Sequence, residues 1–260
     1  MIKIVAVTDI HNNVKDLEKL VDRVISKTED FPLVRAGKND HTFDHSDLNL
    51  FVITGDIQDD PGDKVDSVPV TDHVNEDMIR LDEAGFMCFV VPGNHDVGKK
   101  GIFYSEAAKD HFCKQFDTHV FPYHYEFPAY DFCLIGVDST AGADDTILAA
   151  GEIGKAQLEE LDRILSETQC KHKVVLMHHH PVKRTSHSDS VGMELVDSEE
   201  YRRIATKWGV TLTIHGHRHS YQGQYKKEGI LTFTPGKLKG DRFSVVEIRD
   251  NGRVFSTLGV

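Results

Sequence analysis

The chain has 260 residues, and its 30 basic and 42 acidic side chains give a formal net charge of −12 when histidine is neutral. This length suits one domain with a substantial core, and 39% hydrophobic with 28% charged residues excludes a disordered or fibrous chain. The acidic balance disfavours nucleic acid as a partner, because a polyanion is captured by basic surfaces. We therefore expect a single domain over residues 1–260.

The sequence also predicts a compartment. No apolar run approaches the roughly 18 residues that a membrane-spanning helix needs, so we expect no membrane partner. Residues 1–7 are typical of a β-strand that leads into a charged motif, and not of a secretion signal. The four cysteines are scattered without a CxxC pair, and Cys88 and Cys133 lie in apolar runs, as buried reduced thiols do. These features predict a cytoplasmic protein.

Apolar runs of strand length recur along the chain. In the first part, strands are predicted at residues 2–7, 48–53, 86–91, 132–137, 174–177 and 210–214. Helical spacing of apolar residues at 14–25 and 153–165 indicates an alternating α/β fold. After His219, antiparallel strands are predicted at 230–234, 243–248 and 254–258, with Asp250-Asn251-Gly252 in the turn of a hairpin.

Three polar connections are too long to be simple linkers: Thr28–Asp47, Asp59–Asp72 and Ser139–Gly154. They are rich in Gly, Asp and Pro. This composition fits loops that close over a substrate, and it fits ordinary surface loops equally well.

Residues able to carry chemistry follow five of the predicted strands. The motifs are Asp9-Ile10-His11, Gly55-Asp56, Gly93-Asn94-His95-Asp96, His178-His179-His180 and His215-Gly216-His217-Arg218-His219. They contain half of the 16 histidines. Because ligands collect at the carboxyl ends of strands in α/β sheets, we expect these motifs to meet.

The spacing within the motifs favours metal ions. Residues i and i+2 of an extended chain face one side, so Asp9 with His11, and His217 with His219, can each offer two ligands to one point. There are more donors than one ion needs, and the two oxygens of Asp56 can bridge two ions about 3.5–4 Å apart. Imidazole, carboxylate and amide donors without thiolate favour Mn, Fe or Zn over a structural zinc or an all-oxygen site.

Each motif also has a structural interpretation when taken alone. Asp9 suits the N-cap of a helix that starts near Asn13, and Gly55-Asp56 suits a turn. His178–His180 suit half-buried ends of a strand. Their occurrence together at five strand ends favours the metal site. Covalent serine or cysteine catalysis has no motif here, and residues 93–100 depart from a P-loop at Lys100.

The order of these motifs over residues 9–219 resembles that of the calcineurin-like metallophosphoesterase superfamily. The resemblance implies an α/β fold, a four-layer αββα sandwich of two mixed β-sheets flanked by helices. It also implies a ligand set in which one ion is held by Asp9, His11 and His219, the other by Asn94, His178 and His217, and both by Asp56. His215 has no role in the pattern.

The triple-histidine run holds one expected ligand. Spacing alone does not separate His178 from His180, whereas the family pattern places the ligand at His178. Since neighbours in an extended chain point to opposite faces, we expect His179 to point away from the metal ions.

Subfamily features narrow the resemblance. Protein phosphatases of the superfamily carry GDxVDRG, DxHG and a third motif ending in Glu, whereas this chain reads GDIQDD, DIHN and GNHD. A phosphoserine/threonine phosphatase is therefore disfavoured. The segments Val137–Ser139, Gly151–Ile153 and Met177–Pro181 are loosely similar to the bacterial class III cyclic-nucleotide phosphodiesterases.

These features predict a metal-dependent phosphoric ester hydrolase. Its expected substrate is a small phosphodiester such as a cyclic nucleotide, attacked by a hydroxide that bridges the metal ions. We expect His95 to be the catalytic residue at the leaving oxygen, as a general acid or a charge stabiliser oriented by Asp96. A phosphomonoesterase, a nuclease of the same superfamily and a non-enzymatic metal-binding scaffold are the alternatives.

Overall fold

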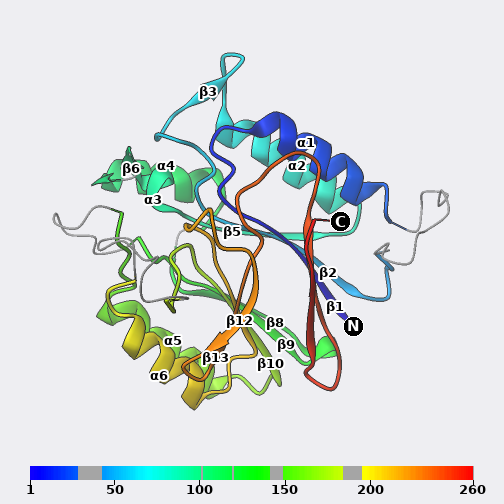
Figure 1. Ribbon diagram of the computed structural model, residues 1–260, viewed down its shortest axis with the longest axis vertical. Helices are drawn as coiled ribbons and strands as arrows, with labels where there is room; N and C mark the ends of the chain where they lie inside the picture. Colours follow the sequence, from blue (N-terminus) through cyan, green and yellow to red (C-terminus); the bar gives the residue numbers. More distant parts are fainter. Residues whose placement is uncertain (29–42, 101, 119, 141–148, 184–194, 260) are drawn as a thin grey trace.

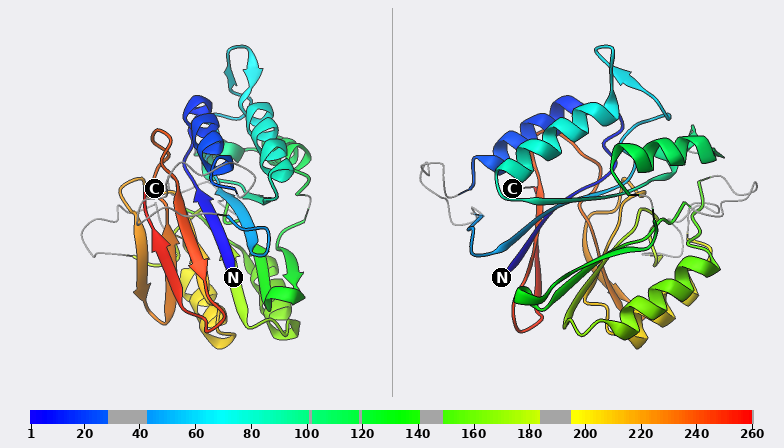
Figure 2. Two further views of the ribbon diagram at one scale, coloured as in Figure 1. Left: turned by 90° about the vertical axis from the view of Figure 1, so that its right-hand side faces the viewer. Right: turned by 180° about the vertical axis from the view of Figure 1, so that it is seen from behind.

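The computed structural model describes residues 1–28, 43–100, 102–118, 120–140, 149–183 and 195–259. Two β-sheets pack face to face, and helices cover the outer face of each sheet (Figures 1 and 2). The predicted four-layer αββα sandwich of two mixed sheets is therefore confirmed.

The first sheet has the strand order β15-β14-β1-β2-β5. Its strands are β1 (Ile2–Val7), β2 (Leu48–Thr54), β5 (Met87–Val91), β14 (Ser244–Ile248) and β15 (Val254–Thr257). The strands β1, β2 and β5 are parallel, whereas β14 is antiparallel to both β1 and β15. The turn between β14 and β15 is the predicted hairpin, in which Gly252 has a φ of 79° and its N–H donates to the carbonyl of Arg249 at 2.7 Å.

The second sheet has the order β12-β13-β11-β10-β9-β8. Its strands are β8 (Tyr123–Phe127), β9 (Phe132–Gly136), β10 (His172–Leu176), β11 (Leu212–Ile214), β12 (Gly223–Lys227) and β13 (Ile230–Thr234). The antiparallel arrangement expected for β13 holds only toward β12, because β13 runs parallel to β11. The mostly buried β13 occupies the interior of the sheet, and the half-exposed β12 forms its edge.

Six helices lie among the described residues: α1 (Val14–Ile25), α2 (Val70–Glu83), α3 (Asn94–Val97), α4 (Glu106–Gln115), α5 (Lys155–Glu167) and α6 (Ser198–Lys207). A 3₁₀ turn covers Pro128–Tyr130, and two small ribbons pair β3 (Lys64–Val65) with β4 (Val68–Pro69) and β6 (Gly98–Lys99) with β7 (Phe103–Tyr104). The prediction located α1 and α5 and missed α2, α4 and α6.

Alternating side chains of the central strands supply two different cores. In β1, Ile4 packs between the two sheets, whereas Val5 packs under α1 and α2. A third core joins the other face of the second sheet to α5 and α6. Because both faces of these strands are covered, they read as continuous apolar runs, which is how the sequence revealed them.

The three long connections differ in what can be said of them. Most of Thr28–Asp47 and part of Ser139–Gly154 lie outside the described residues. The connection Asp59–Asp72 holds the ribbon β3-β4 and the beginning of α2, where Val70 and Val74 are buried at helical spacing. Among the described residues, no helix is long and apolar enough to cross a membrane.

Candidate metal centre

The five motifs follow strands whose carboxyl ends meet at one edge of the sandwich. In the first sheet, the N–H of Asp9 donates to the carbonyl of Gly55 at 3.1 Å, which ties the loop after β1 to the loop after β2. In the second sheet, the N–H of Gly216 donates to the carbonyl of His178 at 2.9 Å. The parallel strand order thus brings together residues far apart in sequence, as predicted.

The backbone is strained at several of these residues. Asp9, His11, Asp56 and His217 have φ values of 53°, 48°, 53° and 68°, in the left-handed region that side chains other than glycine rarely adopt. Such a conformation costs on the order of 1–3 kcal/mol and persists where the surroundings impose it. The fold therefore holds four candidate ligands in a strained backbone conformation, which aims their side chains at the expense of stability.

A first group of donors lies on one side of Asp56. The Nε2 atoms of His11 and His219 are 3.0 Å apart, and His219 Nε2 is 3.2 Å from Asp9 Oδ1. Asp56 Oδ2 is 3.6 Å from His11 Nε2. These four residues form one cluster that could hold a metal ion.

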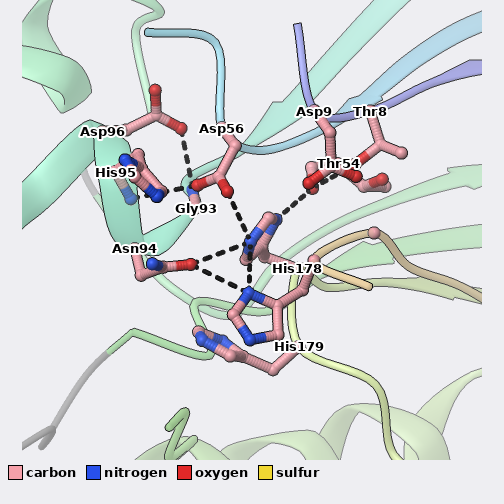
Figure 3. A network of polar contacts seen from close by, with 12 residues as sticks. Thr8, Asp9, Thr54, Asp56, Gly93, Asn94, His95, Asp96, His178 and His179 are labelled. Atoms are coloured by element: carbon pink, nitrogen blue, oxygen red, sulfur yellow. Dashed lines mark hydrogen bonds and ion pairs between the residues drawn. The ribbon is translucent and has the colours of Figure 1, made fainter. Parts of the chain in front are cut away.

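A second group lies on the other side of Asp56 (Figure 3). His178 Nε2 is 3.2 Å from Asp56 Oδ2 and 3.0 Å from Asn94 Oδ1. His217 Nδ1 is 3.0 Å from the same Asn94 oxygen and 3.2 Å from His178 Nε2. Asp56, His178 and His217 form a second cluster that could hold a metal ion, and all three are buried. Asp56 therefore belongs to both donor clusters.

The donor chemistry fits two metal ions. Pairs of imidazole nitrogens face each other at 3.0 and 3.2 Å, and the buried Asp9 Oδ1 accepts no hydrogen bond among the described residues. Burial lowers the pKa of His178, but the adjacent Asp56 carboxylate outweighs it and raises that pKa to about 9. The site therefore attracts a positive charge between these two groups, which is the position that a cation would take.

Two glycines let the loops come this close. A Cβ atom on Gly93 would lie 2.2 Å from Asp56 Oδ1, and one on Gly55 would lie 2.5 Å from the backbone nitrogen of Gly93. Gly55 also has a φ of +85°. The glycines of the second and third motifs are therefore required for the approach of the loop after β2 to the loop after β5.

His95 lies beside the first group. Its ring centroid is 4.9 Å from that of His11, and its Nδ1 donates to the backbone carbonyl of Asp59 at 2.7 Å. The expectation that Asp96 orients His95 is wrong. The Asp96 carboxylate instead accepts the backbone N–H groups of Gly93 at 2.8 Å and of Ile57 at 2.9 Å, and so joins the two loops.

Asp59 is a site residue that the sequence reasoning missed. Its Oδ1 accepts a hydrogen bond from His11 Nδ1 at 2.7 Å, and its Oδ2 accepts one from Asn12 at 3.1 Å. Together with its carbonyl contact to His95, this residue orients two rings of the centre. The available signal was its place three residues after Asp56, in a segment treated only as a long loop.

His179 does not point away from the centre, contrary to expectation. Its ring centroid is 4.5 Å from that of His217 and 5.1 Å from that of His178. The hydroxyl of Ser139 accepts the N–H groups of both His178 and His179, so its own proton goes to His179 Nδ1 at 2.9 Å. Strand β10 ends at Leu176, and the alternation of an extended chain therefore no longer governs these histidines.

Comparison with known proteins identifies the family. Residues 2–221 match the family model of the calcineurin-like phosphoesterases, and the chain belongs to this family. Membership supports a metal-dependent phosphoester hydrolase. No curated protein sequence matches the chain.

Solved structures share the whole fold at low identity. A dimetal phosphatase from Danio rerio has a TM-score of 0.58 and 13% identity, over 100% of this chain and 99% of that chain. The protein TT1561 of Thermus thermophilus has a TM-score of 0.55 and 14% identity, over 99% of each chain. GAP50, described as the anchor in the inner membrane complex of Plasmodium, has a TM-score of 0.62 and 13% identity, over 98% of this chain and 83% of that chain. At such identities the likeness shows the fold alone.

Proposed function

We propose that this chain hydrolyses phosphoesters at a centre of two metal ions, with a small phosphodiester such as a cyclic nucleotide as its preferred substrate. The observation that carries the proposal is the pair of donor clusters that share Asp56, with His95 beside them. A structural role does not explain the imidazole nitrogens that face each other.

The ligand assignment follows the two clusters. One ion would be held by Asp9, His11 and His219, the other by Asn94, His178 and His217, and both by Asp56. The mixed nitrogen and oxygen donors suit Mn, Fe or Zn. When bound, such ions would lower the pKa of a water toward neutral and offset charge on the phosphoryl oxygens.

The chain's own side chains would complete the reaction. Asn94 turns its amide oxygen toward His178 and His217 (Figure 3), and its side chain would also contact a phosphoryl oxygen of the substrate. His95 holds one proton on Nδ1, bound to the Asp59 carbonyl. The doubly protonated ring then gives its Nε2 proton to the leaving oxygen as the ester bond breaks, and becomes neutral.

Domain organisation and compartment form part of the same proposal. Residues 1–260 act as one domain, because β14 and β15 lie beyond the family match and still belong to the first sheet, where β14 pairs with β1 and β15 pairs with β14. All four cysteines are free thiols, which suits the reducing cytoplasm.

The test is the metal content of the purified protein together with a substrate panel. Bis(p-nitrophenyl) phosphate, p-nitrophenyl phosphate, 3′,5′-cyclic AMP and DNA separate a phosphodiesterase from a phosphomonoesterase and a nuclease. Bound metal without turnover of any of them would indicate the scaffold alternative.

Asp56→Asn tests the shared ligand. Because it removes the one carboxylate placed in both clusters, we expect metal content and hydrolysis to fall together. Asp66→Asn is the matched control, since the Asp66 side chain is 75% exposed and pairs only with Lys15 among the described residues. Full metal content and normal turnover in Asp56→Asn would contradict the two-metal assignment.

A further inference from the structure

A cavity lies beside the metal centre, under the loop that connects β13 to β14. Its volume is about 670 Å³, which is within the range of small-molecule sites. Thr8, which directly precedes Asp9, lines the cavity, and its carbonyl accepts the N–H of Leu238 at 3.2 Å. The loop over the cavity is therefore anchored to the chain next to a candidate metal ligand.

The cavity is cationic, although the chain as a whole is acidic. Lys237, Lys239 and Arg242 line it, and Asp241 is the one acidic residue in its lining. Asp241 is already paired with Arg23 of α1 at 3.1 Å. The three cations have no acidic partner within the part of the chain that the structure describes.

The cavity also has an apolar part. The walls of the cavity include the buried apolar side chains of Val7, Leu20 and Leu238. A lining that combines apolar side chains with cations matches a ligand that has an organic body and an anionic end.

We propose that this cavity binds a second phosphate group of the substrate, carried on the same organic body whose scissile phosphate lies at the metal centre. The inference rests on the proposed function, because it places the scissile phosphate at that centre. Three unpaired cations suit a phosphate, which carries up to two charges and accepts paired hydrogen bonds from the Arg242 guanidinium. The substrate class is therefore a phosphodiester whose organic body carries a second, separate phosphate group.

Binding of two inert ligands to the metal-loaded protein tests the proposal by calorimetry. Inorganic phosphate cannot span the two sites, so its binding at the metal centre is measured separately, whereas propylene bisphosphonate offers two separate anionic groups on one organic body and has no ester bond to hydrolyse. We expect the double variant Lys239→Ala/Arg242→Ala to weaken binding of propylene bisphosphonate by about 10–100-fold, and binding of inorganic phosphate at the metal centre by less than twofold. Lys114→Ala, which removes an exposed lysine of α4, is the matched control and leaves both affinities unchanged.

The outcomes separate this proposal from the proposed function. Equal affinity of the wild type and the double variant for propylene bisphosphonate would overturn the second phosphate site, as would an equal loss in Lys114→Ala. Circular dichroism verifies that each variant is folded. If the binding difference appears but the wild type hydrolyses no phosphoester, the proposed function fails and the phosphate site stands.

Discussion

Replacement of His95 by asparagine separates a proton donor from a positioning group. The backbone N–H of His95 donates to Asp56 Oδ1 at 3.0 Å, and this contact survives any change of the side chain. The variant therefore removes the imidazole and its contact to the Asp59 carbonyl and leaves the loop around Asp56 in place. We expect both metal ions to remain bound.

The magnitude depends on the leaving group. An alkoxide of high pKa needs a proton as it departs, and loss of a general acid costs about 10²–10⁴ in kcat. A nitrophenolate leaves readily as the anion, so its kcat falls by about tenfold or less. The difference between the two substrates, and not the size of either loss, identifies proton donation.

The assay compares kcat for 3′,5′-cyclic AMP and bis(p-nitrophenyl) phosphate at saturating metal, with metal content measured on the same samples. His124→Asn, an exposed histidine of β8, is the matched control and leaves both rates unchanged. Equal losses on both substrates would refute proton donation by His95, and loss of metal would make it a structural residue of the centre.

Three further substitutions test other parts of the argument. Asp59→Asn keeps the carbonyl that binds His95 but weakens the side-chain contact to His11. Metal titration should therefore show about 10–100-fold weaker metal binding, and activity should return in excess metal. A loss of activity that excess metal does not restore would contradict the role of Asp59 in orienting His11. His179→Ala removes a fully buried ring, so denaturant unfolding should show a loss of about 2–4 kcal/mol with metal content kept, and a metal-free variant would make His179 a ligand. Burial raises the pKa of Asp77 to about 6, so ionisation of this carboxyl lowers the stability of the fold as the pH rises from about 4 through 6. Asp77→Asn should therefore raise the melting temperature at pH 8 and leave it unchanged at pH 4. An equal change at both pH values would exclude this cause.

The sequence predicted the strands and the candidate ligands because both leave a local pattern. Strands buried on both faces are continuous apolar runs, and the motifs follow directly at their ends. Among the helices that were missed, α2 and α4 were missed for different reasons. In α4 only Phe112 and Cys113 are buried, so its apolar pattern is weak, whereas α2 begins directly after Pro69, inside a segment dominated by charged residues.

The contacts that orient the rings of His11 and His95 could not be predicted in the same way. Asp96 follows His95 in the sequence, yet its carboxylate turns back to the backbone of the neighbouring loops. Asp59 reaches His95 through its carbonyl, an atom that every residue has and that no residue type reveals. The backbone conformation of the turn decides such contacts, and the sequence of this turn does not indicate where its carbonyl groups point.

The charges around the centre bear on the choice between a diester and a monoester. Asp59 contacts His11 from one loop, and Lys237 acts on His11 from another, so an acidic and a basic segment both adjoin the first donor cluster. A monoester carries its second charge on the phosphoryl group itself, close to Asp59 and His95, where the acidic loop opposes it. A diester with a remote phosphate carries the additional charge on its organic body, which can extend to the cations of the cavity. Together with the proposed function, this arrangement of charges leads us to expect a diester at the metal centre and a phosphate at a distance from it.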